Sequence, residues 1–202
     1  MPLCNALRLS WAAHPFTRFS RTLAAMGLIS FALGLAGCDP QKIKELEEGV
    51  STEADVRARF GEPEKIWDAN DMARLPLPAA SLEVLSTPGA RTFEYNRQPL
   101  GNVNYMITIG PDGKMSALRQ VLSPQNFVRV LPGQSMEQVR KLLGKPMKIT
   151  PYALQQTIHY DWRFLNPPQT NRIFTVVFNQ DLKVVNTQIA DEDAITPGGG
   201  VR

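Results

Sequence analysis

The chain has 202 residues, of which 43% are hydrophobic and 20% are charged, and its formal net charge at pH 7 is +3. Three of the 22 basic side chains precede residue 38, where no acidic residue occurs, so the rest of the chain carries 19 basic and 19 acidic side chains. The positive charge therefore belongs to the first segment and gives no support for nucleic-acid binding by the remainder.

Residues 1–37 have the features of an export signal. Three arginines without any acidic residue precede an uncharged apolar run from Leu23 to Ala36. This run is shorter than the roughly 20 apolar residues that a membrane-spanning helix requires. A basic start, a short apolar run and small residues at its end are typical of a secretory signal peptide.

The end of this segment, Leu35-Ala36-Gly37-Cys38, resembles the bacterial lipoprotein signal box. The resemblance implies cleavage before Cys38 and attachment of two or three acyl chains to that residue, which is enough for stable membrane anchoring. The alternative is an uncleaved anchor in which the cysteine is incidental. Cleavage would remove Cys4 with the signal peptide, and the mature chain would then have no cysteine pair for an intrachain disulfide.

The chain beyond the signal contains two similar segments. PQKIKELEEG at Pro40–Gly49 corresponds to PQNFVRVLPG at Pro124–Gly133, and STEADVRARFGEPEKI at Ser51–Ile66 corresponds to QSMEQVRKLLGKPMKI at Gln134–Ile149. The first half carries one extra residue between the glycine and the capping position. Each half predicts a short helix, a turn and a second helix of about nine residues with apolar positions at helical spacing.

Matched residues delimit the second helix of each half. Thr52 and Ser135 are each followed three residues later by a side chain that can complete a capping box. Gly61 and Gly144 occupy the place where a residue with left-handed backbone ends a helix, and a proline two residues later prevents the helix from resuming.

Segments in which apolar and polar residues alternate follow each helix pair and predict antiparallel strands joined by turns. They are Thr92–Asn96, Val103–Ile109 and Met115–Val121 in the first half, Thr157–Phe164, Ile173–Phe178 and Val184–Ile189 in the second, and short edge strands near Lys65–Trp67 and Lys148–Thr150. Tyr95 and Tyr160 are matched between the halves.

We therefore predict an α+β fold of two tandem ααβββ(β) repeats, residues 38–123 and 124–190. Each repeat is expected to pack a helix pair on one face of an antiparallel sheet. Residues 191–202, which end in TPGGGVR, have the composition of a disordered tail.

A stretch of the first half, about residues 68–90, has no counterpart in the second half. Loops of this length are usually functional or disordered. Its leucines, Leu75 and Leu77 among them, would be poorly placed in solvent. Two interpretations are open, a mobile insertion and a partner-binding arm that uses Leu75 and Leu77.

The lipoprotein box followed by a motif that occurs once per half resembles the SmpA/OmlA family of small lipoproteins. In the second half the motif reads Gly133-x-Ser135-x-x-x-Val139-x-x-Leu142-Leu143-Gly144-x-Pro146. The resemblance implies a non-catalytic binding function, because the best-known member is an accessory subunit of the outer-membrane β-barrel assembly machinery. Two tandem units also resemble the doubled architecture of the β-lactamase inhibitor protein.

The same resemblance implies an outer-membrane lipoprotein that faces the periplasm and binds envelope proteins, with subunits of the β-barrel assembly machinery as expected partners. Asp39 directly follows the lipidated cysteine. Aspartate at that position often signals retention in the inner membrane of enteric bacteria, so an inner-membrane location is the alternative.

We predict no enzymatic activity, no cofactor and no metal site. Beyond the signal the chain has one histidine, His159, and Asp161 on the same strand face could orient its imidazole. No candidate nucleophile lies beside it in the sequence. A zinc site would need several cysteine or histidine ligands, and the glycine run at residues 198–200 has no helix after it that could bind phosphate.

The face of each sheet opposite its helices is predicted to be free and to bind a partner. Polar residues that alternate with the core set are expected on it: Glu94, Asn104, Thr108, His159, Asp161 and Arg163. The predicted function is that of an accessory factor in outer-membrane β-barrel protein assembly or envelope integrity. The alternative is an envelope protein inhibitor or a ligand-binding module on the same doubled fold.

Overall fold

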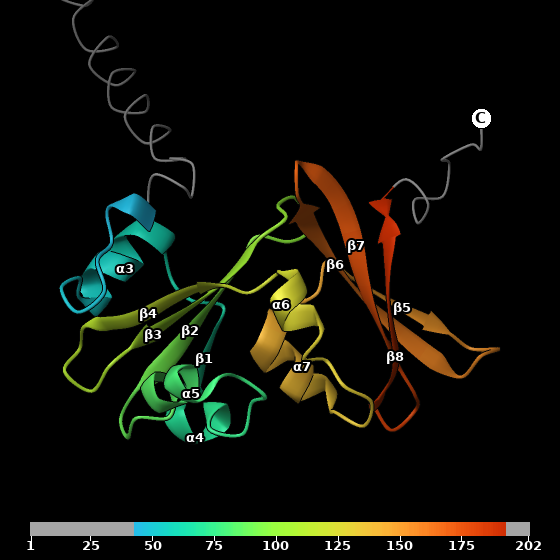
Figure 1. Cartoon of the computed structure of the whole chain (residues 1–202), viewed down its shortest axis with the longest axis horizontal. Coiled ribbons are helices and arrows are strands. Elements are labelled where there is room, and N and C mark those ends of the chain that lie inside the picture. Colours follow the sequence, from blue (N-terminus) through green and yellow to red (C-terminus); the bar gives the residue numbers. More distant parts are fainter. Residues whose placement is uncertain (1–42, 193–202) are drawn as a thin grey trace, which may run out of the picture. The chain divides into compact units, whose positions relative to one another are not determined.

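The computed structural model describes residues 43–192 (Figure 1). Its elements in chain order are α3 (Glu53–Phe60), β1 (Lys65–Asp68), α4 (Ala69–Met72), α5 (Ala79–Leu85), β2 (Arg91–Asn96), β3 (Asn104–Ile109), β4 (Met115–Gln120), α6 (Pro124–Phe127), α7 (Met136–Leu143), β5 (Lys148–Tyr152), β6 (Thr157–Asn166), β7 (Thr170–Phe178) and β8 (Val184–Asp191). The signal peptide, Cys38 and all but the first two residues of the predicted tail lie outside the described residues.

The strands form two four-stranded antiparallel sheets, with the orders β1-β2-β3-β4 and β5-β6-β7-β8. Every strand pairs with its neighbour in sequence, as tight turns require. The register shifts once in each sheet, between Thr108 and Ile109 and between Val177 and Phe178. The eight predicted strands are confirmed, and the chain has a mixed α/β fold with two antiparallel sheets and a few short helices.

Capping boxes begin α3 and α7 as predicted. The side chain of Thr52 accepts from the Asp55 backbone N–H at 3.3 Å, and the side chain of Ser135 accepts from the Gln138 N–H at 3.2 Å. Both boxes are reciprocal, so two backbone donors are satisfied at each helix start.

Glycine ends both helices. Gly61 and Gly144 have φ of 82° and 76°, and each donates its N–H to the carbonyl four residues earlier. Their ψ angles of −164° and −172° differ from the left-handed helical conformation that was predicted. This extended backbone with positive φ is adopted almost exclusively by glycine. Glycine is therefore required at both helix ends, although the backbone conformation is not the left-handed helical one that the sequence predicts.

One core lies between α3 and the first sheet. Val56 and Phe60 of the helix contact buried residues of three strands: Phe93, Tyr95, Tyr105, Ile107, Ile109 and Met115. The ring of Phe60 lies 5.2 Å from that of Tyr95 and 5.6 Å from that of Tyr105, centroid to centroid. Ile43 and Leu46, just before α3, pack against the same cluster.

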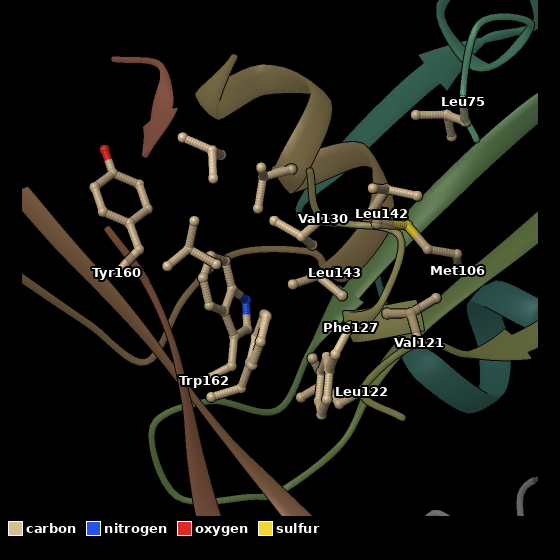
Figure 2. Close-up of a cluster of buried hydrophobic side chains, with 14 of the residues drawn as sticks. Leu75, Met106, Val121, Leu122, Phe127, Val130, Leu142, Leu143, Tyr160 and Trp162 are labelled. Atoms are coloured by element: carbon tan, nitrogen blue, oxygen red, sulfur yellow. The ribbon is translucent and has the colours of Figure 1, made fainter. Parts of the chain in front are cut away.

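A second core joins the second sheet to elements of the first half (Figure 2). Tyr160 and Trp162 of β6 are buried in one cluster with Phe127 of α6 and Leu143 of α7, and the centre of the Phe127 ring lies 4.2 Å from that of Phe174, on which it stacks. The same cluster contains Trp67, Met106, Val121 and Leu122. Helix α7 is therefore buried on more than one side, and it contacts the face of the first sheet that does not carry α3.

Residues 68–90 are ordered and belong to this second core. They form α4 and α5, and Met72, Leu75 and Leu85 are at most 4% exposed. Leu77 and Leu82 are partly buried against the same cluster. Both sequence interpretations of Leu75 are thus wrong, because its side chain is buried as a member of the second core. Figure 2 shows Leu75 at the edge of this cluster.

Candidate interaction faces

Glu94, a candidate partner-binding residue, is completely buried on β2. Its carboxylate accepts hydrogen bonds from Trp67 Nε1 at 3.2 Å, from Arg140 Nε and Nη2 at 3.2 Å, and from the Lys145 backbone N–H at 2.9 Å. Arg140 belongs to α7 and Lys145 follows that helix. The expectation that Glu94 is exposed is wrong, because this carboxylate binds the helix of the second half.

Asn104 on β3 is also completely buried and binds the end of the same helix. Its Nδ2 donates to the carbonyls of Leu143 at 2.9 Å and Lys145 at 3.2 Å, while its Oδ1 accepts from the Arg97 N–H at 3.2 Å. A helix C-terminus leaves carbonyls without intrahelical partners, and Asn104 supplies a donor for one of them. Its predicted exposure is wrong, as is that of Thr108, which is buried with its hydroxyl 3.0 Å from that of Thr92.

A further ion pair attaches α7 to α4. Lys141 is 8% exposed, and its Nζ lies 3.0 Å from Asp71 Oδ1, 2.7 Å from Glu137 Oε1 and 5.1 Å from the centre of the Trp67 ring. The hydrogen bond from Lys141 lowers the pKa of Asp71. Burial lowers the pKa of Lys141, but its bonds to Glu137 and Asp71 outweigh that effect and the net shift is upward. We call the contacts of Glu94, Asn104 and Asp71 with α7 the α7 joint.

Arg119 on β4 lies in the same row of the first sheet as Glu94 and Met106. The side chain is half-buried, and within residues 43–192 its Nε and Nη2 atoms are covered without a hydrogen-bond partner. Burial lowers the pKa of the guanidinium to about 10. Among the described residues, the α7 joint therefore gives Glu94 several donors, while two guanidinium nitrogens of Arg119 in the same row of the sheet have no acceptor.

The second sheet presents a different surface. Helices α6 and α7 lie on one side of the second sheet (Figure 1). Tyr160, Trp162 and Phe164 of β6 belong to the core that the sheet shares with these helices, so residues of the other parity point away. We call this second surface the outer face. Its exposed or half-buried members include Lys148, Thr150 and Tyr152 on β5, His159, Arg163 and Leu165 on β6, and Asn186 and Gln188 on β8.

His159 lies on the outer face and is half-buried, as the alternation predicted. Its ring is 4.3 Å from that of Tyr152, and its Nε2 is 3.4 Å from Thr157 Oγ1. Asp161 is only 5% exposed, which contradicts its predicted exposure, and its carboxylate accepts from Thr175 Oγ1 at 2.7 Å. The polar partner of Asp161 is thus a threonine hydroxyl rather than the imidazole that it was expected to orient.

Arg163 is half-buried at the far end of β6. Its Nε donates to Glu192 Oε1 at 2.6 Å, and its backbone carbonyl accepts from Gln98 Nε2 at 2.8 Å. Gln98 Oε1 also accepts from the Arg163 N–H at 3.3 Å. The side-chain amide of Gln98 therefore occupies the edge of β6 beyond the last residue that β5 pairs.

Within the described part of the chain, no three His, Cys, Asp or Glu side chains are grouped so that they could hold a metal ion. In the same part, no helix has both the length and the apolar character that crossing a membrane requires. Cys38 cannot be placed, because it lies outside the described residues.

Sequence reasoning missed the α7 joint. The signal available was the cluster of basic residues in the last turn of α7, Arg140 and Lys141, followed by Lys145. Basic residues are also common at the C-terminal end of a helix, where they interact with the negative end of the helix dipole. Their presence alone therefore does not predict that they bind a buried carboxylate on a distant strand.

Comparisons with known proteins found few similarities. No protein-family model matches the chain. No curated protein matches it either. Among solved structures, a DUF4309 family protein (YjgB) from Bacillus subtilis is 18% identical, with 73% of this chain and 82% of that chain covered and a TM-score of 0.24.

Proposed function

We propose that this chain is a lipid-anchored module of the bacterial cell envelope that binds other proteins without catalysis. Its role would be that of an accessory factor in outer-membrane β-barrel protein assembly or in envelope integrity. The basic start, apolar run and Leu35-Ala36-Gly37-Cys38 box support the anchor. The SmpA/OmlA-like motif in both halves supports the binding function.

The finer proposal on the fold is that the two halves are copies of one repeat. Both sheets have the same strand order, both have one register shift between the third and fourth strands, and isolated bridges join Thr52 to Lys114 and Ser135 to Lys183. These shared details support duplication more strongly than composition does, because they concern irregular features.

The strand registers change the match between the halves. Ile66 pairs with Phe93, whereas Ile149 pairs with Tyr160. If β1 corresponds to β5, then Tyr95 corresponds to Trp162 and Glu94 corresponds to Asp161. The sequence match paired Tyr95 with Tyr160 instead, so the two alignments differ by two residues. A shift of two preserves the face on which each side chain lies.

The observation that carries the proposal is the unequal use of this face. On the first sheet the face with Glu94 binds α7 through the contacts given above. On the second sheet the corresponding face, with Asp161 at its centre, is the outer face, and its rim residues Lys148, Tyr152 and Gln188 are exposed. We propose the outer face as the surface that binds a partner.

Affinity purification from detergent-solubilised membranes tests this proposal. The wild-type lipoprotein is expected to bring down the large subunit of the β-barrel assembly machinery. The double variant Lys148→Gln, Tyr152→Ala should lose that partner, because it removes a charge and a ring from the outer face.

The first sheet offers a matched control, Lys65→Gln with Ile66→Ala. Lys65 and Ile66 also lie on the edge strand of their sheet, and Ile66 is 42% exposed compared with 41% for Tyr152. This control should keep the partner. Equal partner recovery with both double variants would rule out the outer face, and a soluble enzyme as sole partner would favour the inhibitor alternative.

A further inference from the structure

The distance between the anchor and the fold is limited by the chain. Ile43 follows Cys38 by five residues. A fully extended chain spans at most about 3.6 Å per residue, so Ile43 lies within about 18 Å of the lipidated residue. Ile43 and Leu46 pack against the core between α3 and the first sheet. The first described residues are therefore held at a fixed place on the first half of the protein.

The contacts of residues 43–49 identify that part. Glu45 Oε2 accepts from Nε of Arg59, in the last turn of α3, at 3.1 Å. Gly49 N–H donates to the Met115 carbonyl at 2.7 Å, at the other end of the helix, where Thr52 bridges to Lys114. The segment thus runs back along α3, and its first residues lie towards the end of the helix that contains Phe60.

The loop between β2 and β3, residues 97–103, lies at the same end. The guanidinium of Arg97 is 5.4 Å from the centre of the Phe60 ring. The loop also contacts the second sheet, through Gln98 to Arg163 and through Asn102 Nδ2 to Asn171 Oδ1 at 3.0 Å. Ends of both sheets therefore meet near the point where the chain enters the fold.

Two exposed leucines occur at this end. Leu100, in the loop, is 95% exposed, and Leu165, two residues beyond Arg163 on the same face of β6, is 45% exposed. The side chain of Leu100 buries almost no apolar surface in the fold, whereas its burial in an apolar environment would be favourable. We call Leu100, Leu165 and residues 97–103 the anchor end.

We propose that the anchor end lies against the phospholipid surface that holds Cys38 and that Leu100 enters the bilayer interface. The inference rests on the lipidation proposed above. The short tether brings this end to the membrane, and the side chain at the loop tip is apolar, as an interfacial contact requires.

Leu154 provides an internal control. It is 97% exposed and lies in the turn between β5 and β6, before the first residue of β6, whereas Leu165 is near the last. A ten-residue strand is about 30 Å long. Leu100 and Leu154 are exposed to nearly the same extent. Leu154 precedes the start of β6, whereas the loop that carries Leu100 contacts Arg163 near the end of that strand, so only Leu100 lies at the anchor end.

The test uses the full lipidated protein in phosphatidylcholine vesicles that contain spin-labelled lipid. An environment-sensitive fluorophore is attached at Leu100→Cys or, in a separate protein, at Leu154→Cys. The introduced thiol is unique, because Cys4 leaves with the signal peptide and the Cys38 sulfur carries lipid. We expect several-fold stronger quenching and a blue-shifted emission at position 100, and emission typical of water at position 154.

Mass spectrometry of the same samples separates the two proposals. Lipidated protein with equal quenching at the two positions, or with stronger quenching at position 154, would overturn the anchor end as the membrane-facing surface while leaving the proposed function intact. An unmodified Cys38 would instead overturn the anchor on which both depend. A signal-less Cys38→Ser protein should show no quenching at either position, and quenching there would show that the tether is not what positions Leu100.

Discussion

The two sheets have the same strand order, but the faces opposite Tyr95 and Trp162 are used differently. On the first sheet, the fully buried Glu94 receives donors from β1, from α7 and from the backbone after α7. On the second sheet, the buried Asp161 receives the hydroxyl of Thr175, its neighbour within the sheet. The equivalent face of the sheet therefore binds α7 in the first half, whereas in the second half its central acid bonds, among the described residues, only within the sheet.

This difference explains why α7 is more apolar than α3. Four residues of α7 are buried, including Lys141, whereas α3 buries only Val56 and Phe60. A helix with one covered side needs one apolar stripe, and a helix between a sheet and a second partner needs a wider one. The difference between the halves is thus already present in two helices of equal length.

The largest expected effect concerns the buried acids. Glu94→Ala leaves the Trp67 and Lys145 donors without an acceptor and removes the partner of Arg140, so we expect the free energy of unfolding to fall by about 3–5 kcal/mol. Asp161→Ala should lower it by only about 1–2 kcal/mol, because one hydroxyl bond is lost. Urea denaturation of signal-less protein measures both, and equal losses would contradict the unequal roles of the two acids.

The two helix-ending glycines sharpen the comparison. Both have positive φ, so alanine should destabilise each site by about 1–2 kcal/mol. A Cβ at Gly61 meets nothing within 4 Å, whereas a Cβ at Gly144 would lie 2.9 Å from Asn104 Nδ2. Gly144→Ala should therefore cost about 1–3 kcal/mol more than Gly61→Ala, as measured by denaturation midpoints at constant m-value. A larger loss at Gly61 would show that α7 does not end against Asn104.

The caps should respond nearly alike, because each side chain accepts the equivalent backbone hydrogen bond. In the first half, Thr52 Oγ1 also donates to Asp55 Oδ2 at 2.8 Å, but this bond is exposed to solvent. We expect Thr52→Ala and Ser135→Ala each to lower the free energy of unfolding by about 1 kcal/mol, since each removes one acceptor for a backbone donor. Thermal denaturation can compare them. A difference between the two variants of much more than this amount would contradict equivalent capping in the two halves.

The smallest expected effect is at Asp71 in the α7 joint. Its carboxylate is 42% exposed, so Asp71→Asn should lower stability at pH 7 by only about 0.5 kcal/mol. The bond to Lys141 lowers the pKa of Asp71 below its ordinary value of 3.8. The contribution is therefore present above pH 3.8 and is lost as the pH falls through the lower folded-state pKa. Unfolding measured from pH 7 to pH 2.5 should show the two proteins converging at the acid end, and a constant difference would contradict this ion pair.

Local patterns were sufficient to predict much of the fold. The strands are specified by alternation and turn residues, and the starts of α3 and α7 by capping residues three positions apart. These signals depend on residues close in sequence, so each could be recognised without knowledge of the other half.

The candidate site was harder, because its contacts join distant segments. Glu94 alternates with core residues, as a solvent-facing residue would, and only the position of Arg140 and Lys145 shows that it is buried. Leu75 and Leu77 were recognised as unsuited to solvent, yet the surface that covers them comes from the second core. His159 and Arg163 are placed on the outer face as alternation predicted, since no segment described here buries them completely.

A double-mutant cycle on Glu94 and Arg140 tests most directly whether the first sheet uses its second face to bind α7. The variants are Glu94→Gln, Arg140→Met and their combination, with free energies of unfolding measured in urea. Direct contact at 3.2 Å predicts a coupling energy of about 1–3 kcal/mol. Losses that add to within about 0.3 kcal/mol would contradict the joint, and the face of Glu94 and Asn104 would again be available to a partner.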